Sequence, residues 1–181
     1  IYGASAWRTA PSHPSGDEPH YLVVTQSLLQ DGDLQPENNY NQRDFARYYQ
    51  GDIRPDYVRR GLNGAIYSSH APGLSVLVLP VFALFGYTGT VVLLVVLSAC
   101  TAGVTWWLAW CVTRRTGAAW FAWGTLMAAP GLLLTNAVFP DGVAPLLVCL
   151  GLLPLVDQRA RSPLVLIGLG ASVMMLPWLH T

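Results

Sequence analysis

The chain changes from polar to apolar near residue 73, and its second part contains long apolar runs. A helix that crosses a bilayer needs about 20 consecutive apolar residues. The runs in the second part that approach this length are Val91–Val112, Ala118–Phe139, Val143–Val156 and Pro163–Leu179. The pattern predicts an all-α polytopic membrane protein with about four transmembrane helices. It divides the chain into a polar segment, 1–73, and a transmembrane helical block, 74–181.

A shorter apolar run, Pro72–Gly86, precedes the first of these spans. As a helix it would measure about 22 Å, which is too short for a hydrocarbon core of about 30 Å. We expect it to form an interfacial or re-entrant helix, which membranes tolerate where protein or water covers the backbone. If it does not cross, residues 1–73 lie on the same side as Asp141; if it crosses, they lie in the cytoplasm.

The arginines of the apolar block indicate its orientation. They occur in two groups separated by two predicted spans, so both groups fall on one side: Arg114, Arg115, Arg159 and Arg161. The positive-inside rule makes that side cytoplasmic. Residues 1–73, Asp141 and His180 are then expected at the extracytoplasmic face of a plasma (inner) membrane.

The polar segment contains one predicted amphipathic helix. Ser15 and Glu18 have the spacing of a capping box, and Pro19 suits a first helical turn. The following residues place an apolar face opposite Gln26, Ser27 and Gln30, until Asp31-Gly32-Asp33 ends the pattern. We expect this helix to lie on the membrane or on the spans. A second short helix is expected around Gln42–Gln50.

Composition excludes several classes of protein. Lys+Arg and Asp+Glu both number 10, so the chain lacks the basic stripe of a generic nucleic-acid binder. Charged residues make up only 11%, whereas an average soluble domain is roughly a quarter charged. The 3 cysteines lie in apolar runs and form no metal-binding spacing. Because residue 1 is Ile, we expect a fragment of a longer membrane protein.

The adjacent acids Asp17 and Glu18 are the first candidates for chemistry. At a helix start beside a bilayer they could supply a general base or hold a divalent metal cation. Neighbouring helical residues point apart, so the two make a poor glycosidase pair. From spacing alone the favoured interpretation is structural, because acids in a first turn complement the helix dipole and Glu18 could complete the capping box.

The run from Tyr67 to Leu74 is the second candidate. Pro72 sits where a helix begins, and the free N–H groups of a helix start favour an anion such as phosphate. His70 could add a donor or a positive charge; the alternative is a turn with a solvated histidine. Asp141 is a third candidate, as a helix cap or as the wall of a site. His20 and His180 share this face and are weaker candidates.

Several short motifs in a fixed order together resemble the C-type membrane glycosyltransferases, which include dolichyl-phosphate-mannose protein mannosyltransferases and bacterial aminoarabinose transferases. They are Gly16-Asp17-Glu18-Pro19, Asp31-Gly32-Asp33-Leu34, Tyr67 through Leu74, Arg114-Arg115-Thr116-Gly117, Phe139-Pro140-Asp141 and Leu176 through His180. The resemblance implies an N-terminal fragment of a multi-span enzyme that takes a sugar from a polyprenyl-phosphate carrier at the outer face. It implies catalytic roles for Asp17 and Glu18, with Asp17 first, and a place near the carrier phosphate for His70 and Tyr67.

The same resemblance implies an acceptor of unknown kind, contact with membrane lipid and a divalent metal in some members. Two other functions stay open. Helices broken at Pro130-Gly131 and Pro145 could belong to a transporter subunit, although such proteins carry functional polar residues at mid-bilayer and these spans are almost entirely apolar. A non-catalytic assembly segment is the third possibility, and it predicts that the acids tolerate neutralisation.

Overall fold

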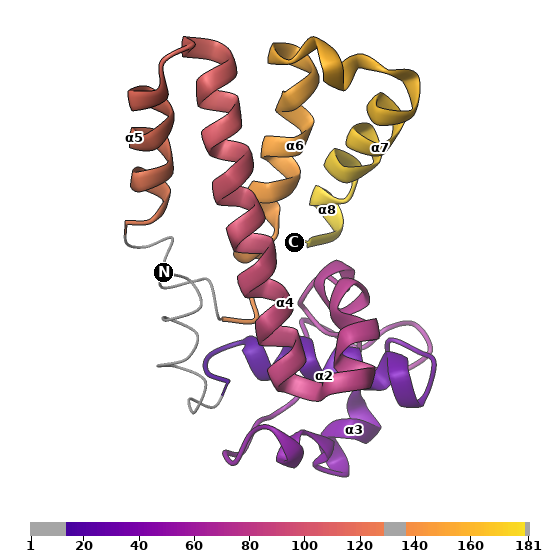
Figure 1. Cartoon of the computed structure of the whole chain (residues 1–181). Helices are drawn as coiled ribbons and strands as arrows, with labels where there is room; N and C mark the ends of the chain where they lie inside the picture. The colour runs from indigo at the N-terminus through magenta and orange to yellow at the C-terminus, as the bar shows by residue number, and fades with distance from the viewer. Residues whose placement is uncertain (1–13, 129–136, 180–181) are drawn as a thin grey trace.

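A computed structural model of the chain describes residues 14–128 and 137–179. Within these ranges the protein is helical and contains no strand, which confirms the all-α prediction. Figure 1 shows a long central helix, with α5 on one side and α6, α7 and α8 on the other. A cap formed by α2, α3 and the loops after them covers one end of this helix. The elements are α2 (Glu18–Gln30), α3 (Glu37–Asn41), η1 (Asp44–Arg47), α4 (Gly73–Thr113), α5 (Thr116–Leu126), η2 (Pro140–Gly142), α6 (Ala144–Val156), η3 (Gln158–Arg161), α7 (Pro163–Met174) and α8 (Leu176–Leu179).

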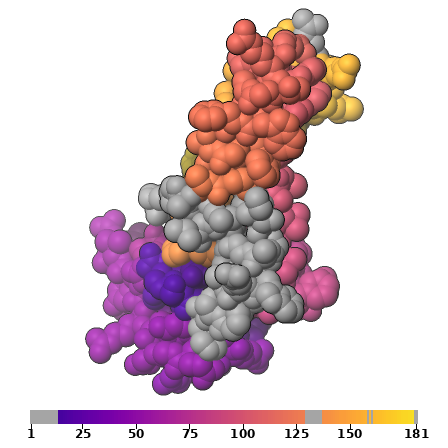
Figure 2. Space-filling model, turned by 60° about the vertical axis from the view of Figure 1, so that its left-hand side comes forward, coloured from indigo at the N-terminus to yellow at the C-terminus, as the bar shows by residue number. Residues whose placement is uncertain are grey.

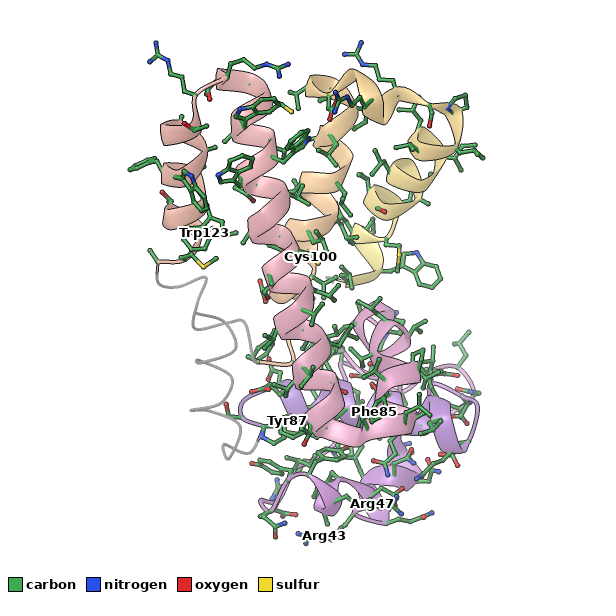
Figure 3. The ribbon with its side chains drawn as sticks, in the orientation of Figure 1. Arg43, Arg47, Phe85, Tyr87, Cys100 and Trp123 are labelled. Atoms are coloured by element: carbon green, nitrogen blue, oxygen red, sulfur yellow. The ribbon has the colours of Figure 1, made fainter. Side chains whose placement is uncertain are left out.

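The central helix α4 bends sharply at Gly86. This residue has φ 61° and ψ −151°, a conformation that glycine adopts readily and other residues rarely do. The bend separates an arm over 73–85, which packs against α2, from the long arm that continues to Thr113 (Figure 1). Figure 3 shows Phe85 and Tyr87 on the two sides of the bend. A distinct short helix ending at Gly86 was predicted, and the break is confirmed.

The apolar helices form two hairpins, α4 with α5 and α6 with α7, and these hairpins pack together through α4 and α6. Helix α5 follows α4 after a turn at Arg114, whose backbone is left-handed at φ 54°. Helices α6 and α7 pack on each other, and α6 also packs on α4. The third predicted helix, Val143–Val156, is confirmed as α6, which begins one residue later, at Ala144. The fourth predicted segment, Pro163–Leu179, is confirmed in its extent as an apolar helical stretch, with a break at Met175 between α7 and α8.

The second predicted span, Ala118–Phe139, is wrong as a single helix, since α5 ends at Leu126. Only α4 among the described helices is long and apolar enough to cross a membrane, judged by length and composition. The prediction of about four spanning helices is therefore not confirmed. Many large apolar side chains of the outer helices are nevertheless exposed, including Phe121 at 78%, Leu164 at 82% and Met174 at 78%.

Exposed apolar faces of this extent mark contact with lipid or with other protein. Figure 2 shows the elongated outline, with the purple N-terminal cap at one end and the orange and yellow helices toward the other. The connections α4–α5 and α6–α7 both lie at the end opposite the cap (Figure 1). The two arginine groups thus occupy one end of the molecule, as the sequence predicted.

Helix α2 packs on α4, which agrees with the predicted position on the spans, but it is buried on both sides, so its predicted amphipathic character is wrong. Gln26 and Ser27, expected on the polar face, are 2% and 0% exposed. Helix α4 covers one side of α2, while α3 and η1 cover the other. The buried polar groups have partners: Tyr48 Oη donates to Gln26 Oε1 at 3.3 Å, and Ser27 Oγ donates to Asp33 Oδ1 at 2.8 Å.

The end of α2 follows the predicted signal. The N–H groups of Asp31 and Gly32 both donate to the carbonyl of Ser27, at 2.8 and 3.1 Å. Gly32 is left-handed at φ 74°, the usual conformation just after a helix C-terminus. The chain then forms α3 and η1 rather than one helix around Gln42–Gln50, so that prediction is correct in position and wrong in form. Phe45 of η1 is 1% exposed and anchors this side of the core.

Candidate functional site

The adjacent acids Asp17 and Glu18 have different environments. Asp17 is the N-cap residue of α2, makes no side-chain capping bond and is exposed. Glu18 is 5% exposed and turns inward. Its Oε1 accepts a hydrogen bond from the Ser15 N–H at 3.1 Å, and its Oε2 accepts one from the Val138 N–H at 2.8 Å. Helix geometry explains the divergence, since neighbouring positions point about 100° apart.

The bond from Glu18 to Val138 joins two distant parts of the chain, 120 positions apart. This bond fixes the position of the segment that contains Val138. It holds the segment that leads into Phe139 and η2 against the start of α2, and Gly16 lies beside the Phe139 ring, which is 3.8 Å from where a Cβ at Gly16 would be. Asp141, in η2, is exposed. The structural interpretation of Glu18, which its spacing in the sequence favoured, is supported by these contacts.

Tyr21 lies one helical turn after Asp17 and forms the centre of the cluster. Its ring centroid is 4.6 Å from that of His70, and its edge contact with Phe139 has a centroid distance of 6.3 Å. Burial raises the pKa of the Tyr21 hydroxyl, and the negative charges of Asp17 and Asp141 raise it further. The fold therefore brings Asp17, His70 and Asp141 around one tyrosine.

His70 lies on the loop just before α4 and is held by a neighbouring loop. Its Nε2 is 2.9 Å from Asp56 Oδ2, an ion-pair distance, although the N–H direction does not meet hydrogen-bond geometry. The Ser69 N–H donates to the Asp56 carbonyl at 3.0 Å, which fixes the two loops together. The His70 side chain is 14% exposed. The alternative of a turn with a fully solvated histidine is therefore wrong.

His20 extends the cluster toward α3. Its Nδ1 lies 2.6 Å from the Tyr40 hydroxyl, and its ring centroid is 5.7 Å from that of His70. Burial lowers the pKa of His20, and the nearby His70 lowers it further, against the raising effects of Asp56 and Asp17. His20 is thus neutral near pH 7. Burial raises the pKa of Tyr40, so the pair is held together without charge.

Tyr67, predicted to bind the donor phosphate, has a different contact. Its hydroxyl accepts a hydrogen bond from Asn63 Nδ2 at 2.9 Å, and its ring packs on Gly61. The side chain is 42% exposed, in a turn before His70. These contacts give Tyr67 a role in the 61–67 turn. His180 lies outside the described residues.

A divalent metal at Asp17 and Glu18 stays a prediction. Both oxygens of Glu18 already accept backbone N–H groups, so only Asp17 of the pair presents a free carboxylate. Within the described ranges, no group of three or more His, Cys, Asp and Glu side chains is arranged to hold a metal ion. The residues present do not fit a metal held by the acidic pair, and no step below uses one.

Three members of the cluster were not predicted from the sequence: Tyr21, Tyr40 and Asp56. Tyr21 had a usable signal, because residues at i and i+4 of a helix share a face and Asp17 starts the helix. Tyr40 and Asp56 lie in a polar stretch without periodicity. Their positions depend on contacts between loops, which no local pattern encodes.

Comparison with known proteins adds no further constraint. No family model, curated protein or solved structure matches the chain.

Proposed function

We propose that the protein is a membrane glycosyltransferase that moves a sugar from a polyprenyl-phosphate carrier to an acceptor hydroxyl at the extracytoplasmic face. The observation that carries the proposal is the cluster at one end of α4. These residues come from three separate parts of the chain: Asp17, Tyr21, His70 and Asp141. The Tyr21 ring contacts that of His70, and the charges of both acids raise the pKa of the Tyr21 hydroxyl. The cluster lies where the apolar helices meet the polar cap.

A lipid-linked sugar suits this location. The carrier's prenyl chain requires apolar surroundings, which the exposed apolar faces of the helices supply. Its phosphate requires hydrogen-bond donors and positive charge. His70 and the first N–H groups of α4 offer donors, and the positive end of the α4 dipole offers the latter.

Asp17 is the proposed general base. Its carboxylate takes the proton from the acceptor hydroxyl while that oxygen forms a bond to the anomeric carbon of the sugar. The bond from the anomeric carbon to the phosphate oxygen breaks, and its electron pair leaves with the polyprenyl phosphate. A single displacement of this kind inverts the anomeric configuration. It needs one base and one good leaving group, so Glu18 is free for its structural role.

The experiment is transfer of radiolabelled sugar from a polyprenyl-phosphate donor by the purified full-length protein in liposomes, because the fragment alone is expected to be inactive. Asp17→Asn is expected to lower the rate by about 100-fold or more, the usual contribution of a positioned general base. Asp52→Asn is the matched control, because Asp52 is an exposed acid of the same cap, 80% accessible and 3.7 Å from Arg43. It should leave the rate unchanged.

Two results would count against the proposal. Full activity in Asp17→Asn would remove the assigned base. Absence of any transfer by the unaltered protein with several polyprenyl-phosphate sugars, together with flux of a solute across the liposome membrane, would favour a transporter subunit instead.

A further inference from the structure

A cavity lies at the end of the helices opposite the cap and is separate from the cluster described above. Its volume is about 310 Å³, and it is lined by the last turns of α4 and α6 and the start of η3: Trp107, Trp110, Cys111, Arg114, Val156, Asp157 and Arg159. The size is at the lower limit for small-molecule sites and suits a headgroup rather than a whole lipid.

The aromatic and basic side chains that line this cavity pack against one another. The Trp107 and Trp110 rings stack with centroids 5.1 Å apart. The Arg114 guanidinium carbon lies 4.7 Å from the Trp110 ring centroid, a cation–π contact that holds the guanidinium beside the ring.

The one acid of the lining is already engaged. Asp157 Oδ2 accepts a hydrogen bond from Trp107 Nε1 at 3.0 Å, and its Oδ1 accepts one from the Arg159 backbone N–H at 3.0 Å. Across residues 14–128 and 137–179, no acid lies within ion-pair distance of the guanidinium groups of Arg114 and Arg159. Two arginines against one acid leave the lining with a net positive charge.

We propose that this cavity binds the phosphodiester group of an anionic phospholipid. Arginine is the side chain best shaped to bind phosphate, and basic pockets between helices at a membrane surface bind such headgroups. The surroundings favour a lipid over a free phosphate ion. Val112 and Leu155, the chain neighbours of the lining, are 66% and 69% exposed, so acyl chains would find apolar surface beside the cavity.

The proposal is tested by native mass spectrometry of the purified protein released from nanodiscs that contain equal phosphatidylglycerol and phosphatidylcholine. The unaltered protein should retain phosphatidylglycerol preferentially. Arg114→Gln and Arg159→Gln should each weaken retention about fivefold, the effect of one basic residue near an anionic lipid. Arg114→Lys keeps the charge and should lose less than Arg114→Gln. These substitutions leave the proposed catalytic cluster untouched, so the result is independent of the proposed function.

Arg115→Gln is the matched control. Arg115 is the chain neighbour of Arg114, is exposed, and does not line the cavity. Its substitution removes the same charge from the same end, and retention should stay within twofold. Equal losses for Arg114→Gln and Arg115→Gln would overturn the proposal, because the attraction would then be general surface charge. Displacement of the lipid by millimolar inorganic phosphate would also overturn it, in favour of a soluble anion.

Discussion

Substitution of Glu18 tests whether this buried acid is a structural link. In Glu18→Ala the N–H of Val138 loses its acceptor inside the protein, which costs about 1–3 kcal/mol. The loss of the partly buried bond to the Ser15 N–H adds about 1 kcal/mol, and the loss of the favourable charge at the start of α2 adds about 0.3–1 kcal/mol. The expected fall in the free energy of unfolding is therefore about 2–5 kcal/mol.

Glu18→Gln should fall between the native protein and Glu18→Ala. Its carbonyl oxygen can still accept from the Val138 N–H, but its amide nitrogen would face the Ser15 N–H, and two donors cannot pair. The expected loss is about 1.5–3 kcal/mol, the value of one hydrogen bond to a charged group.

The assay is reversible unfolding in mixed micelles, combined with hydrogen exchange at the Val138 amide. Glu37→Ala is the control, because Glu37 pairs with Arg60 at 2.8 Å on the surface and exposed pairs contribute little. It should change the unfolding free energy much less and leave exchange at Val138 unchanged. Equal losses for Glu18→Ala and Glu37→Ala, or unaltered exchange at Val138 in Glu18→Ala, would refute the reasoning.

Two further predictions concern packing and pH. A Cβ at Gly73 would collide with the backbone carbonyl of Trp178, so Gly73→Ala should lower the free energy of unfolding by about 1–3 kcal/mol, whereas Gly103→Ala, with open space around it, should not lower it. Because the pKa of His20 is lowered in the folded protein, the unfolded chain binds the proton first as the pH falls below 6.5. The free energy of unfolding should therefore decrease as the pH is lowered from 6.5 to the pKa of His20 in the folded protein. His20→Gln should make this free energy less dependent on pH in thermal unfolding.

The parts of the fold that the sequence predicted are those encoded locally. The short arm of α4 was predicted because an apolar run of insufficient length ends in a glycine, and Gly86 is indeed the bend. The end of α2 at Asp31-Gly32 followed from the same kind of signal. Both depend on one residue's backbone preferences and require no knowledge of the rest of the chain.

The burial of α2 could not be predicted in this way. Gln26 and Ser27 look like a solvent face by periodicity, and they are buried because Tyr48, directly after η1, and Asp33, in the loop after α2, supply partners. The spacing of polar and apolar residues describes the faces of one helix. A polar side chain can be buried where a distant segment supplies its hydrogen-bond partner, and that spacing does not show it.

In the candidate site, too, the features encoded locally were predicted and those that depend on distant contacts were not. Asp17, His70 and Asp141 were predicted individually, from a helix start, a helix-initiating proline and a turn. Their grouping around Tyr21 depends on the Glu18–Val138 bond and on the pairing of His70 with Asp56, both between segments remote in sequence. The second span was predicted too long for a related reason, since α5 ends at Leu126 although the apolar run continues beyond it.

The central claim is that the cap with Asp17 faces outward and the arginine end faces inward. It is tested by labelling single-cysteine variants, with the native Cys100, Cys111 and Cys149 replaced by alanine, using a membrane-impermeant maleimide on intact cells. Asp17→Cys should react directly, and Arg115→Cys only after the cells are permeabilised. Reaction of Arg115→Cys in intact cells, with Asp17→Cys protected until permeabilisation, would contradict the account.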